Sequence, residues 1–268
     1  MTARILAPMV DLHAHLLPGI DDGPDSIVSS LALARAAVAS GTRVMACTPH
    51  IDHTWGIDPT QVPGLVERMR AELTDAGIQL EIVAGGEHAP TRAAELDDDA
   101  LRSVALGKGS WLLLESPRRD PGRLLETVIF DLRTRGFHVL LAHPERSPIF
   151  QHDYERLMAL VRSGVCCSIT GSALTGSFGG VPRKLALRML ADEIVHDVAS
   201  DAHDAARRRP DLGPARDVVG RVAGGGVNKA RWMCDALPEA IVAGAALPQA
   251  PAADRPRARQ GLLARLRR

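Results

Sequence analysis

Seven short apolar segments alternate with helix-like segments through most of the chain, and this alternation constrains the fold more than any other feature. The apolar segments are rich in Leu, Val, Ile and Ala, and they are Met9–Leu12, Arg43–Cys47, Leu80–Ala84, Trp111–Leu114, His138–Ala142, Val165–Ile169 and Ile194–Ala199. Nearly continuous apolar runs of this length are typical of strands that are buried on both faces of a parallel sheet. Parallel strands need crossover connections, so the alternation predicts an α/β fold.

The segments between the strands have the periodicity and the endings of helices. Four of them are each followed directly by a glycine, and they are Ser26–Ser40, Thr60–Ala76, Arg123–Arg135 and Asp153–Ser163. Glycine at this place is the usual signal that ends a helix, because it adopts the left-handed conformation without strain. About seven strand–helix units favour a barrel over an open sheet.

The last part of the chain departs from this pattern. Three glycines at 224–226 interrupt it, and Asn228–Ala243 is predicted to form a final helix. We therefore place one domain at residues 1–247, followed at 248–268 by a Pro/Ala-rich linker and an arginine-rich tail. Arg255–Arg268 contains six arginines and no acidic residue. Such a tail is either a solvated, partly disordered end or a segment that docks on an acidic partner or a lipid headgroup.

The charge balance and the cysteines exclude several classes of protein. Lys plus Arg and Asp plus Glu both number 32, so no overall field favours nucleic acid or a membrane surface. The four cysteines form no C-x-x-C pair, which argues against a disulfide framework and for a reducing compartment. The sequence contains no recognisable signal peptide and no apolar run of membrane-spanning length, so we expect a cytoplasmic protein without a membrane span.

Polar side chains that can bind metals follow the strand ends. They are His13 and His15 after the first strand, His50 after the second, Glu87 after the third, Glu115 after the fourth, His143 after the fifth, and Asp201 and His203 after the seventh. The sixth strand is the exception and ends in the small polar stretch TGSALTGSFGG. A lone histidine at a strand end is more often an ordinary loop residue. Because the carboxyl ends of parallel strands open on one face of a barrel, however, we expect this repeated set to converge.

The expected cluster contains imidazoles and carboxylates but no thiolate, a set that suits divalent ions such as Zn, Mn or Fe. Eight such groups exceed the needs of one tetrahedral ion and suit two or three ions that share a bridging carboxylate. Multinuclear hydrolases use a metal-bridging hydroxide at such a centre. The chain has no C-x5-R, no phosphate-binding glycine loop and no G-x-S-x-G motif, so attack by a protein side chain is not expected.

A few further polar residues allow two interpretations. Asp21 and Asp22, in the stretch LPGIDDGP, form either an ordinary turn or a carboxylate that folds over the pocket. His88 neighbours Glu87 and could face the pocket, but we favour a role other than metal binding. The remaining histidines have no position at a strand end and are not expected to be ligands, and they are His53, His138, His152 and His196.

The motifs DLHAHLLPGIDDGP, TPH, GGEH, LLLESP, LAHPER and SDAH, in this order, resemble the polymerase-and-histidinol-phosphatase (PHP) superfamily. Within it, the chain is most similar to the bacterial capsule-type, metal-dependent protein tyrosine phosphatases, over about residues 9–213. The resemblance implies a distorted (β/α)7 barrel of the PHP fold with its active site at the carboxyl ends of the strands. It also implies three divalent ions per chain, with manganese as the preferred metal and iron or zinc as alternatives.

The same resemblance implies a role for each polar residue. One ion would be held by His13, His15, Glu87 and Asp201, a second by Glu87 as a bridge with Glu115 and His143, and a third by Asp22, His50 and His203. The expected catalytic residues are Asp201, Arg146 of the HPER motif and one arginine of the run 207–209. Arg146 would bind the substrate phosphate. In the run we favour Arg208 for its spacing from His203, over Arg207 and the main rival Arg209.

The predicted function is therefore hydrolysis of a phosphate monoester. The resemblance implies phosphotyrosine in a protein as the substrate, such as the tail of a bacterial tyrosine kinase. One alternative is a small phosphoester such as histidinol phosphate at the same site. A second is a polymerase-associated nuclease, against which the neutral charge argues. A third is a metal-binding regulatory protein without turnover, against which the complete ligand set argues. Departures from the family at residues 169–172 and on both sides of Glu87 leave the substrate open, and the oligomeric state is open too.

Overall fold

The strands of the molecule pair in parallel throughout the part that the computed structural model describes, residues 8–119, 123–223 and 225–252. They are β1 Met9–Ala14, β2 Thr42–Cys47, β3 His50–Ile51, β4 Glu81–Ala84, β5 Glu87–His88, β6 Trp111–Glu115, β7 His138–Ala142, β8 Cys166–Thr170 and β9 Asp197–Ala199. One sheet has the order β1-β2-β4 and the other has the order β3-β5-β6-β7-β8-β9. The predicted parallel α/β fold is confirmed.

Two bends in the chain connect the sheets. After β2 the chain turns at Thr48 and Pro49 and continues as β3, and after β4 it turns at Gly85 and Gly86 and continues as β5. A side chain at the second bend has no room, because a Cβ on Gly86 would lie 2.7 Å from Ile51 Cγ1. The second and third predicted strands are confirmed as β2 and β4, and each bend is followed by a short strand that was not predicted, β3 with His50 and β5 with Glu87.

The first and last strands meet at their carboxyl ends. Ala14 and Ala202 form an isolated parallel bridge, the His15 N–H donates to the Ala202 carbonyl at 2.8 Å, and the Asp201 N–H donates to the His13 carbonyl at 2.8 Å. This seam brings the histidines that follow β1 beside the acidic residue that follows β9.

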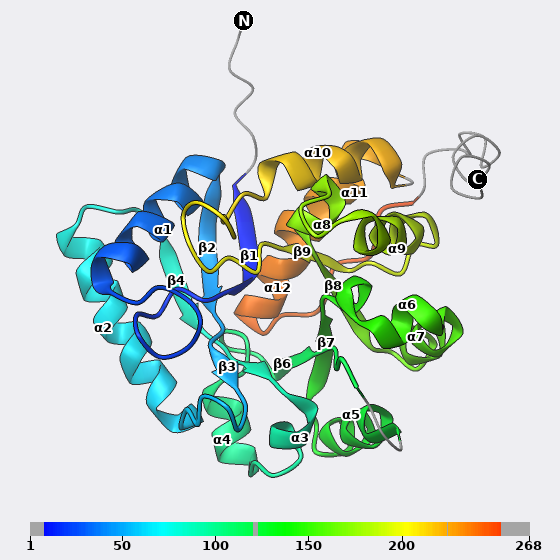
Figure 1. Ribbon diagram of the computed structural model, residues 1–268, viewed down its shortest axis with the longest axis horizontal. Helices are drawn as coiled ribbons and strands as arrows, with labels where there is room; N and C mark the ends of the chain where they lie inside the picture. The colour runs from blue at the N-terminus through cyan, green and yellow to red at the C-terminus, as the bar shows by residue number, and fades with distance from the viewer. Residues whose placement is uncertain (1–7, 120–122, 224, 253–268) are drawn as a thin grey trace, which may run out of the picture.

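Helices surround the strands on the outside (Figure 1). They are α1 Ile27–Ser40, α2 Val62–Asp75, α3 Pro90–Ala93, α4 Asp98–Ser103, α5 Leu124–Thr134, α6 Pro148–His152, α7 Tyr154–Arg162, α8 Gly171–Thr175, α9 Gly180–Ala191, α10 Gly213–Val222, α11 Gly226–Arg231 and α12 Leu237–Ala243. The core between helices and strands consists mainly of Leu, Val, Ile and Ala. Among the described residues, no helix is long and apolar enough to cross a membrane.

The predicted helices are confirmed, although others were missed. α1 begins where the Ser26 hydroxyl accepts the Ser29 N–H, and it ends at Gly41 with φ of 96°. The predicted final helix is α11 and α12 joined by a π-helical turn at Trp232–Ala236. α9 and α10 were not predicted, because Gly-Val-Pro and Gly-Pro at their starts read as loops, although proline is well tolerated in a first helical turn.

The start of the predicted linker packs against the domain, because Trp232 Nε1 donates to the Pro248 carbonyl at 3.0 Å. Residues 253–268, which include the arginine-rich tail, lie outside the described residues. The boundary at residue 247 stays a prediction.

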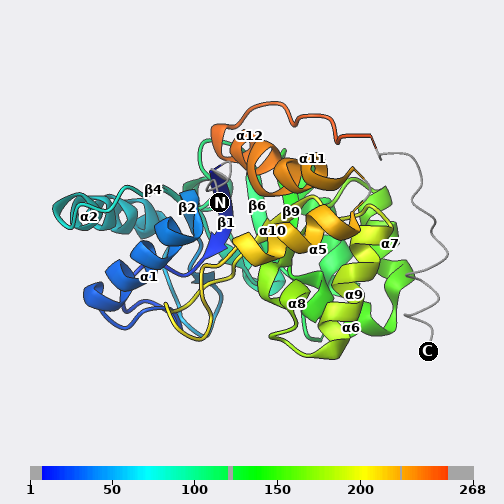
Figure 2. The ribbon, with the colours of Figure 1, turned by 90° about the horizontal axis from the view of Figure 1, so that it is seen from above.

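α11 and α12 follow each other end to end along one edge of the molecule (Figure 2). α12 packs near the amino ends of the strands, where Arg43 at the start of β2 pairs with Glu239 at 3.1 Å and the Lys108 N–H donates to the Val242 carbonyl at 2.8 Å. This contact depends on Gly107, which has φ of 67° and on which a Cβ would lie 2.3 Å from the Val242 oxygen.

We expect Gly107→Ala to lower the free energy of unfolding by about 3 kcal/mol or more, because the left-handed backbone and the clash with Val242 both contribute. Gly56→Ala is the matched control, since Gly56 has φ of 61° with nothing within 4 Å, and it should cost about 1 kcal/mol. Urea unfolding of both variants measures the difference. Equal losses would show that the packing of α12 on Gly107 does not limit stability.

Candidate metal centre

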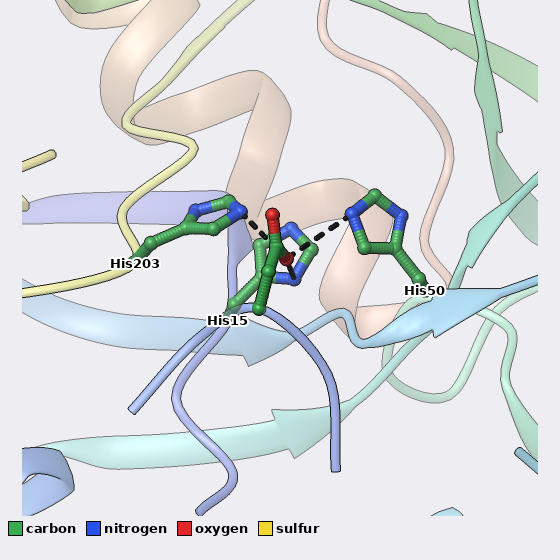
Figure 3. Close-up of side chains that lie close together, drawn as sticks. His15, His50 and His203 are labelled. Carbon is green, nitrogen blue, oxygen red and sulfur yellow. Dashed lines mark ion pairs between the residues drawn. The ribbon is translucent and has the colours of Figure 1, made fainter. Parts of the chain in front are cut away.

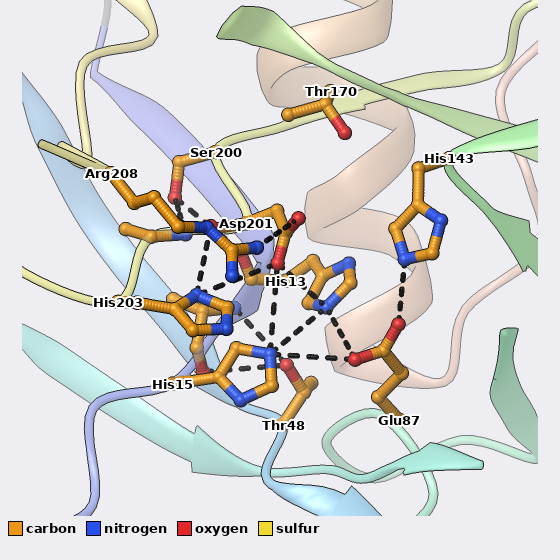
Figure 4. Close-up of polar contacts among 12 residues, drawn as sticks. His13, His15, Thr48, Glu87, His143, Thr170, Ser200, Asp201, His203 and Arg208 are labelled. Atoms are coloured by element: carbon orange, nitrogen blue, oxygen red, sulfur yellow. Dashed lines mark hydrogen bonds and ion pairs between the residues drawn. The ribbon is translucent and has the colours of Figure 1, made fainter. Parts of the chain in front are cut away.

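The predicted cluster forms where the carboxyl ends of the strands meet (Figure 4). The structure brings together all nine residues that the sequence analysis assigned to metals, and they are His13, His15, Asp22, His50, Glu87, Glu115, His143, Asp201 and His203. Three groups of these residues have donor atoms that lie within 4.8 Å of one another: His15, Asp22, His50 and His203; His13, His15 and Glu87; and His50, Glu87 and Glu115. His88, in contrast, is buried with its Nδ1 against the Leu113 carbonyl at 3.1 Å.

Glu87 is the central carboxylate of the cluster. Its Oε2 lies 3.2 Å from His13 Nε2, 3.4 Å from His15 Nε2 and 3.1 Å from His50 Nδ1. Its Oε1 lies 2.7 Å from His143 Nε2 (Figure 4). The side chain is buried, so one carboxylate faces four imidazoles in a site with little access to water.

A second carboxylate, that of Asp22, closes the cluster from the loop after β1. Its Oδ1 lies 3.3 Å from His50 Nε2, 3.1 Å from His203 Nε2 and 3.8 Å from His15 Nδ1. Figure 3 shows these three imidazoles converging on one carboxylate. The sequence allowed two interpretations of the DDG stretch, an ordinary turn or a carboxylate that folds over the pocket. The second interpretation is correct for Asp22.

Asp201 joins the histidines to two arginines. Its Oδ1 lies 3.4 Å from His13 Nε2 and 3.6 Å from His15 Nε2. Its Oδ2 accepts hydrogen bonds from Arg146 Nη1 and, at 2.6 Å, from Arg208 Nη2. The imidazole cluster and the guanidinium groups are therefore adjacent parts of one site.

Of the three arginines at 207–209, one points toward this site and two are exposed to solvent. Arg208 points toward the cluster, and its buried Nε makes no hydrogen bond among the described residues. Arg207 and Arg209 are exposed. The Asp204 carboxylate fixes the turn by accepting the backbone N–H groups of Ala206, Arg207 and Arg208.

Two residues of the cluster have left-handed backbone conformations, which are unusual for residues other than glycine. His143 has φ of 36° and Asp201 has φ of 52°. Both are held by backbone hydrogen bonds, from the His143 N–H to the Ser168 carbonyl and from the Asp201 N–H to the His13 carbonyl, each at 2.8 Å. Such conformations concentrate at functional sites, where the surrounding structure enforces them.

The charges in the cluster shift the pKa values of its members in opposite directions. Burial alone would raise the pKa of Glu87, but the charge and hydrogen bond of His13 and the hydrogen bond of His143 hold it well below its ordinary value. Burial would lower the pKa of His15, but hydrogen bonds to Asp21 and Glu87 raise it to about 10. Burial, with the nearby charge of Glu87, raises the pKa of Glu115 to about 7.

These features fit a set of divalent cations. His50 Nδ1 and His203 Nε2 are buried and form no hydrogen bond of good geometry with any described residue, although each lies 3.1 Å from a carboxylate oxygen. A cation placed between each nitrogen and its neighbouring carboxylate would satisfy both groups. Glu115 and Glu87 repel each other across the cluster, and a cation between them would remove that repulsion. Metal binding requires neutral imidazoles, so protons compete with the metal.

The sequence analysis gave Asp21 no definite role, but the structure places it directly behind a ligand candidate. Its Oδ2 lies 2.7 Å from His15 Nδ1 and accepts the His50 N–H at 3.1 Å, while its Oδ1 accepts the Gly23 N–H at 3.0 Å. A carboxylate only accepts, so the proton stays on Nδ1 when the ring is neutral for metal binding, and the lone pair of His15 Nε2 then faces the cluster. In the sequence only the family resemblance separates Asp21 from Asp22, since the turn decides which carboxylate points inward.

Fold and site together define the class of the protein, which is a parallel α/β protein whose strand ends present a cluster of side chains that could hold metal ions. The family described as capsular polysaccharide synthesis, CpsB/CapC, matches residues 9–236. The chain belongs to this family.

Relatives of known name support the assignment. The chain is 32% identical to the tyrosine-protein phosphatase YwqE of Bacillus subtilis, over 75% of this chain and 79% of that protein. It is 25% identical to the tyrosine-protein phosphatase CpsB of Streptococcus pneumoniae, over 81% of this chain and 91% of that protein.

Solved structures agree with these relatives. A crystal structure from work on YwqE of Bacillus subtilis and CpsB of Streptococcus pneumoniae, described as metal-dependent tyrosine phosphatases, superposes with a TM-score of 0.80 at 28% identity. The match covers 92% of this chain and 100% of that one. An amidohydrolase from Mycoplasma synoviae, with a TM-score of 0.53 at 12% identity, covers 92% of this chain and 90% of that one, and it shows likeness of fold alone.

We expect Asp21→Ala to weaken metal binding by about tenfold to a hundredfold, because His15 would lose the partner that fixes its ring and its tautomer. Competition with a chromogenic chelator measures the affinity. Asp25→Ala, an exposed acid in the same loop, is the control and should bind metal as the unaltered protein does. Unchanged affinity in the Asp21 variant would contradict this role.

Proposed function

We propose that the protein is a metal-dependent phosphatase that removes phosphate from phosphotyrosine in proteins. The observation that carries the proposal is the carboxylate of Asp201, which has one oxygen toward the imidazoles and the other toward Arg146 and Arg208. A phosphoryl group needs both neighbours, because metal cations polarise its oxygens and guanidinium groups bind them as forks. The tyrosine phosphatases YwqE and CpsB, similar to this chain over most of its length, support the choice of substrate.

The donor groups support three metal positions. We assign the first to His13, His15, Glu87 and Asp201, the second to Glu87, Glu115 and His143, and the third to Asp22, His50 and His203. His50 belongs to the third position because its Nε2 faces Asp22 at 3.3 Å, beside His203. His143 belongs to the second because its Nε2 is 2.7 Å from Glu87 Oε1.

The absence of thiolates from these groups suits manganese, iron or zinc, and the resemblance to the capsule-type phosphatases favours manganese among them. Bound ions of this kind act as Lewis acids and lower the pKa of water, so that hydroxide is available near neutral pH.

The two arginines bind and orient the phosphate. The buried Nε of Arg208 has no hydrogen-bond partner among the described residues, and a phosphate oxygen would satisfy it. Asp201 holds both guanidinium groups in place through Oδ2, so less side-chain motion is lost when phosphate arrives. Their positive charges then neutralise the charge that develops on the phosphoryl oxygens in the transition state.

We also infer that the strand positions close into a distorted (β/α)7 barrel of the PHP type. The bends that continue β2 as β3 and β4 as β5 support this, since they give the two sheets common strand positions. The bridge between Ala14 and Ala202 supports it as well, because it joins the first and last positions. A reducing, cytoplasmic location is supported by the four cysteines, which are all free and buried.

The first experiment compares substrates. We expect the manganese-loaded protein to hydrolyse a phosphotyrosine peptide with a kcat/KM at least about tenfold above that for histidinol phosphate or for the same peptide with phosphoserine. Phosphate release is measured with the metal content recorded. Faster release from histidinol phosphate would identify a small-molecule phosphatase. No release from any of the three, with metals bound, would refute the proposed activity.

A second experiment separates phosphate binding from metal binding. Arg146→Ala should lower kcat/KM by roughly tenfold to a hundredfold, because a charge-assisted hydrogen bond to phosphate is lost, while metal content stays unchanged. His13→Ala should lose metal and activity together. Arg207→Ala is the control for the arginines, since that side chain is exposed, and it should change little. A fully active, metal-replete His13→Ala protein would sink the ligand assignment.

A further inference from the structure

The loop between α8 and α9 places an aromatic ring on one of the two arginines of the site. Phe178 lies between Gly176 and Gly179, which have φ of 98° and 87° and are joined by a hydrogen bond from the Gly179 N–H to the Gly176 carbonyl at 3.0 Å. This tight turn holds the ring half-buried, and Arg146 Cζ lies 4.4 Å from the ring centroid. Nothing in the function described so far uses Phe178.

Arg146 is therefore held from two directions. Its Nη1 donates to Asp201 Oδ2, and its Cζ lies over the ring of Phe178. A guanidinium on an aromatic face gains a cation–π attraction and keeps its N–H groups pointing sideways, where they can bind an anion. The Arg146 side chain is 25% exposed, so part of it remains accessible to a ligand.

The backbone around Phe178 is tied to the same region. The Thr170 N–H, just before α8, donates to Glu145 Oε1 at 2.9 Å, and Glu145 directly precedes Arg146. At the other end of the loop, Arg183 of α9 donates through Nε to the Leu174 carbonyl of α8 at 3.1 Å. The loop is thus anchored on both sides, and the position of the ring follows from the fold.

We propose that Phe178 is a positioning residue that fixes the plane of Arg146 for phosphate binding. The inference rests on the proposed function, in which Arg146 binds the substrate phosphate. Without the ring, the long side chain of Arg146 would regain torsional freedom, and ordering it again would weaken phosphate binding. The ring itself does not touch the phosphate, so its effect on an aryl ester and on inorganic phosphate should be the same.

The test is the affinity of the manganese-loaded full chain for inorganic phosphate, measured by calorimetry, beside the KM for a phosphotyrosine peptide. Phe178→Leu should raise the dissociation constant for phosphate and the KM for the peptide, each by roughly threefold to thirtyfold, the range of a cation–π contact. Phe178→Tyr keeps a ring and should restore both values. Phe130→Leu is the matched control, because Phe130 is exposed on α5 and should change neither. Phe178→Met replaces the leucine variant if the latter does not fold.

A double-mutant cycle isolates the contact. In an Arg146→Ala background, Phe178→Leu should cause no further loss of phosphate affinity, because the ring acts through the arginine. Additive losses would overturn the proposal, as would a loss confined to the phosphotyrosine peptide, which would mean that the ring contacts the substrate. A protein that binds phosphate but does not hydrolyse phosphotyrosine would refute the proposed function alone, because the phosphate affinities would still decide the role of Phe178.

Discussion

The buried negative charge of Glu87 is the constraint on which the rest of the site depends. A carboxylate without access to water is costly unless cationic or hydrogen-bonding partners surround it. Here those partners come from strand positions far apart in the sequence, because His13 lies in β1, His50 in β3 and His143 directly after β7. A shift of any one strand by a residue would turn its imidazole away and leave the charge uncompensated. The cluster therefore forms only when the parallel strands pair in this register, and the buried charge disfavours any other register.

The backbone accommodates this cluster with local departures from regular structure. The bend at Gly85 and Gly86 lets β5 leave the line of β4, so that Glu87 reaches the sheet that contains β6 and β7. Left-handed conformations at His143 and Asp201 turn the chain sharply at two further strand ends. Each departure lowers the stability of the protein, and the apolar core, which is continuous around the strands, offsets this loss. Regular strands thus supply stability, and irregular strand ends supply function.

This division explains how much the sequence could reveal. Apolar runs predicted β7 with its observed bounds, His138–Ala142, because a strand buried on both faces leaves a local pattern. Eight of the nine metal-type side chains were found because each follows such a run, whereas Asp22 was assigned through the family resemblance. The role of Asp21 could not be found in this way, since it depends on a turn that also carries Asp22. The role of Phe178 is even harder to predict from the sequence, because its partner Arg146 lies on another loop and only the tertiary structure brings the two together.

Substrate specificity must come from parts of the molecule other than the strand ends. Everything that the strand ends present, imidazoles, carboxylates and guanidinium groups, recognises a metal ion or a phosphoryl group and not the alcohol that carries it. A phosphotyrosine and a small phosphoester would look alike to Asp201 and its two arginines. Discrimination must then come from the loops around the cluster, which can change while the strands stay fixed. The ring of Phe178 is a different case, because it faces Arg146 and would act on the binding of any phosphoryl group alike.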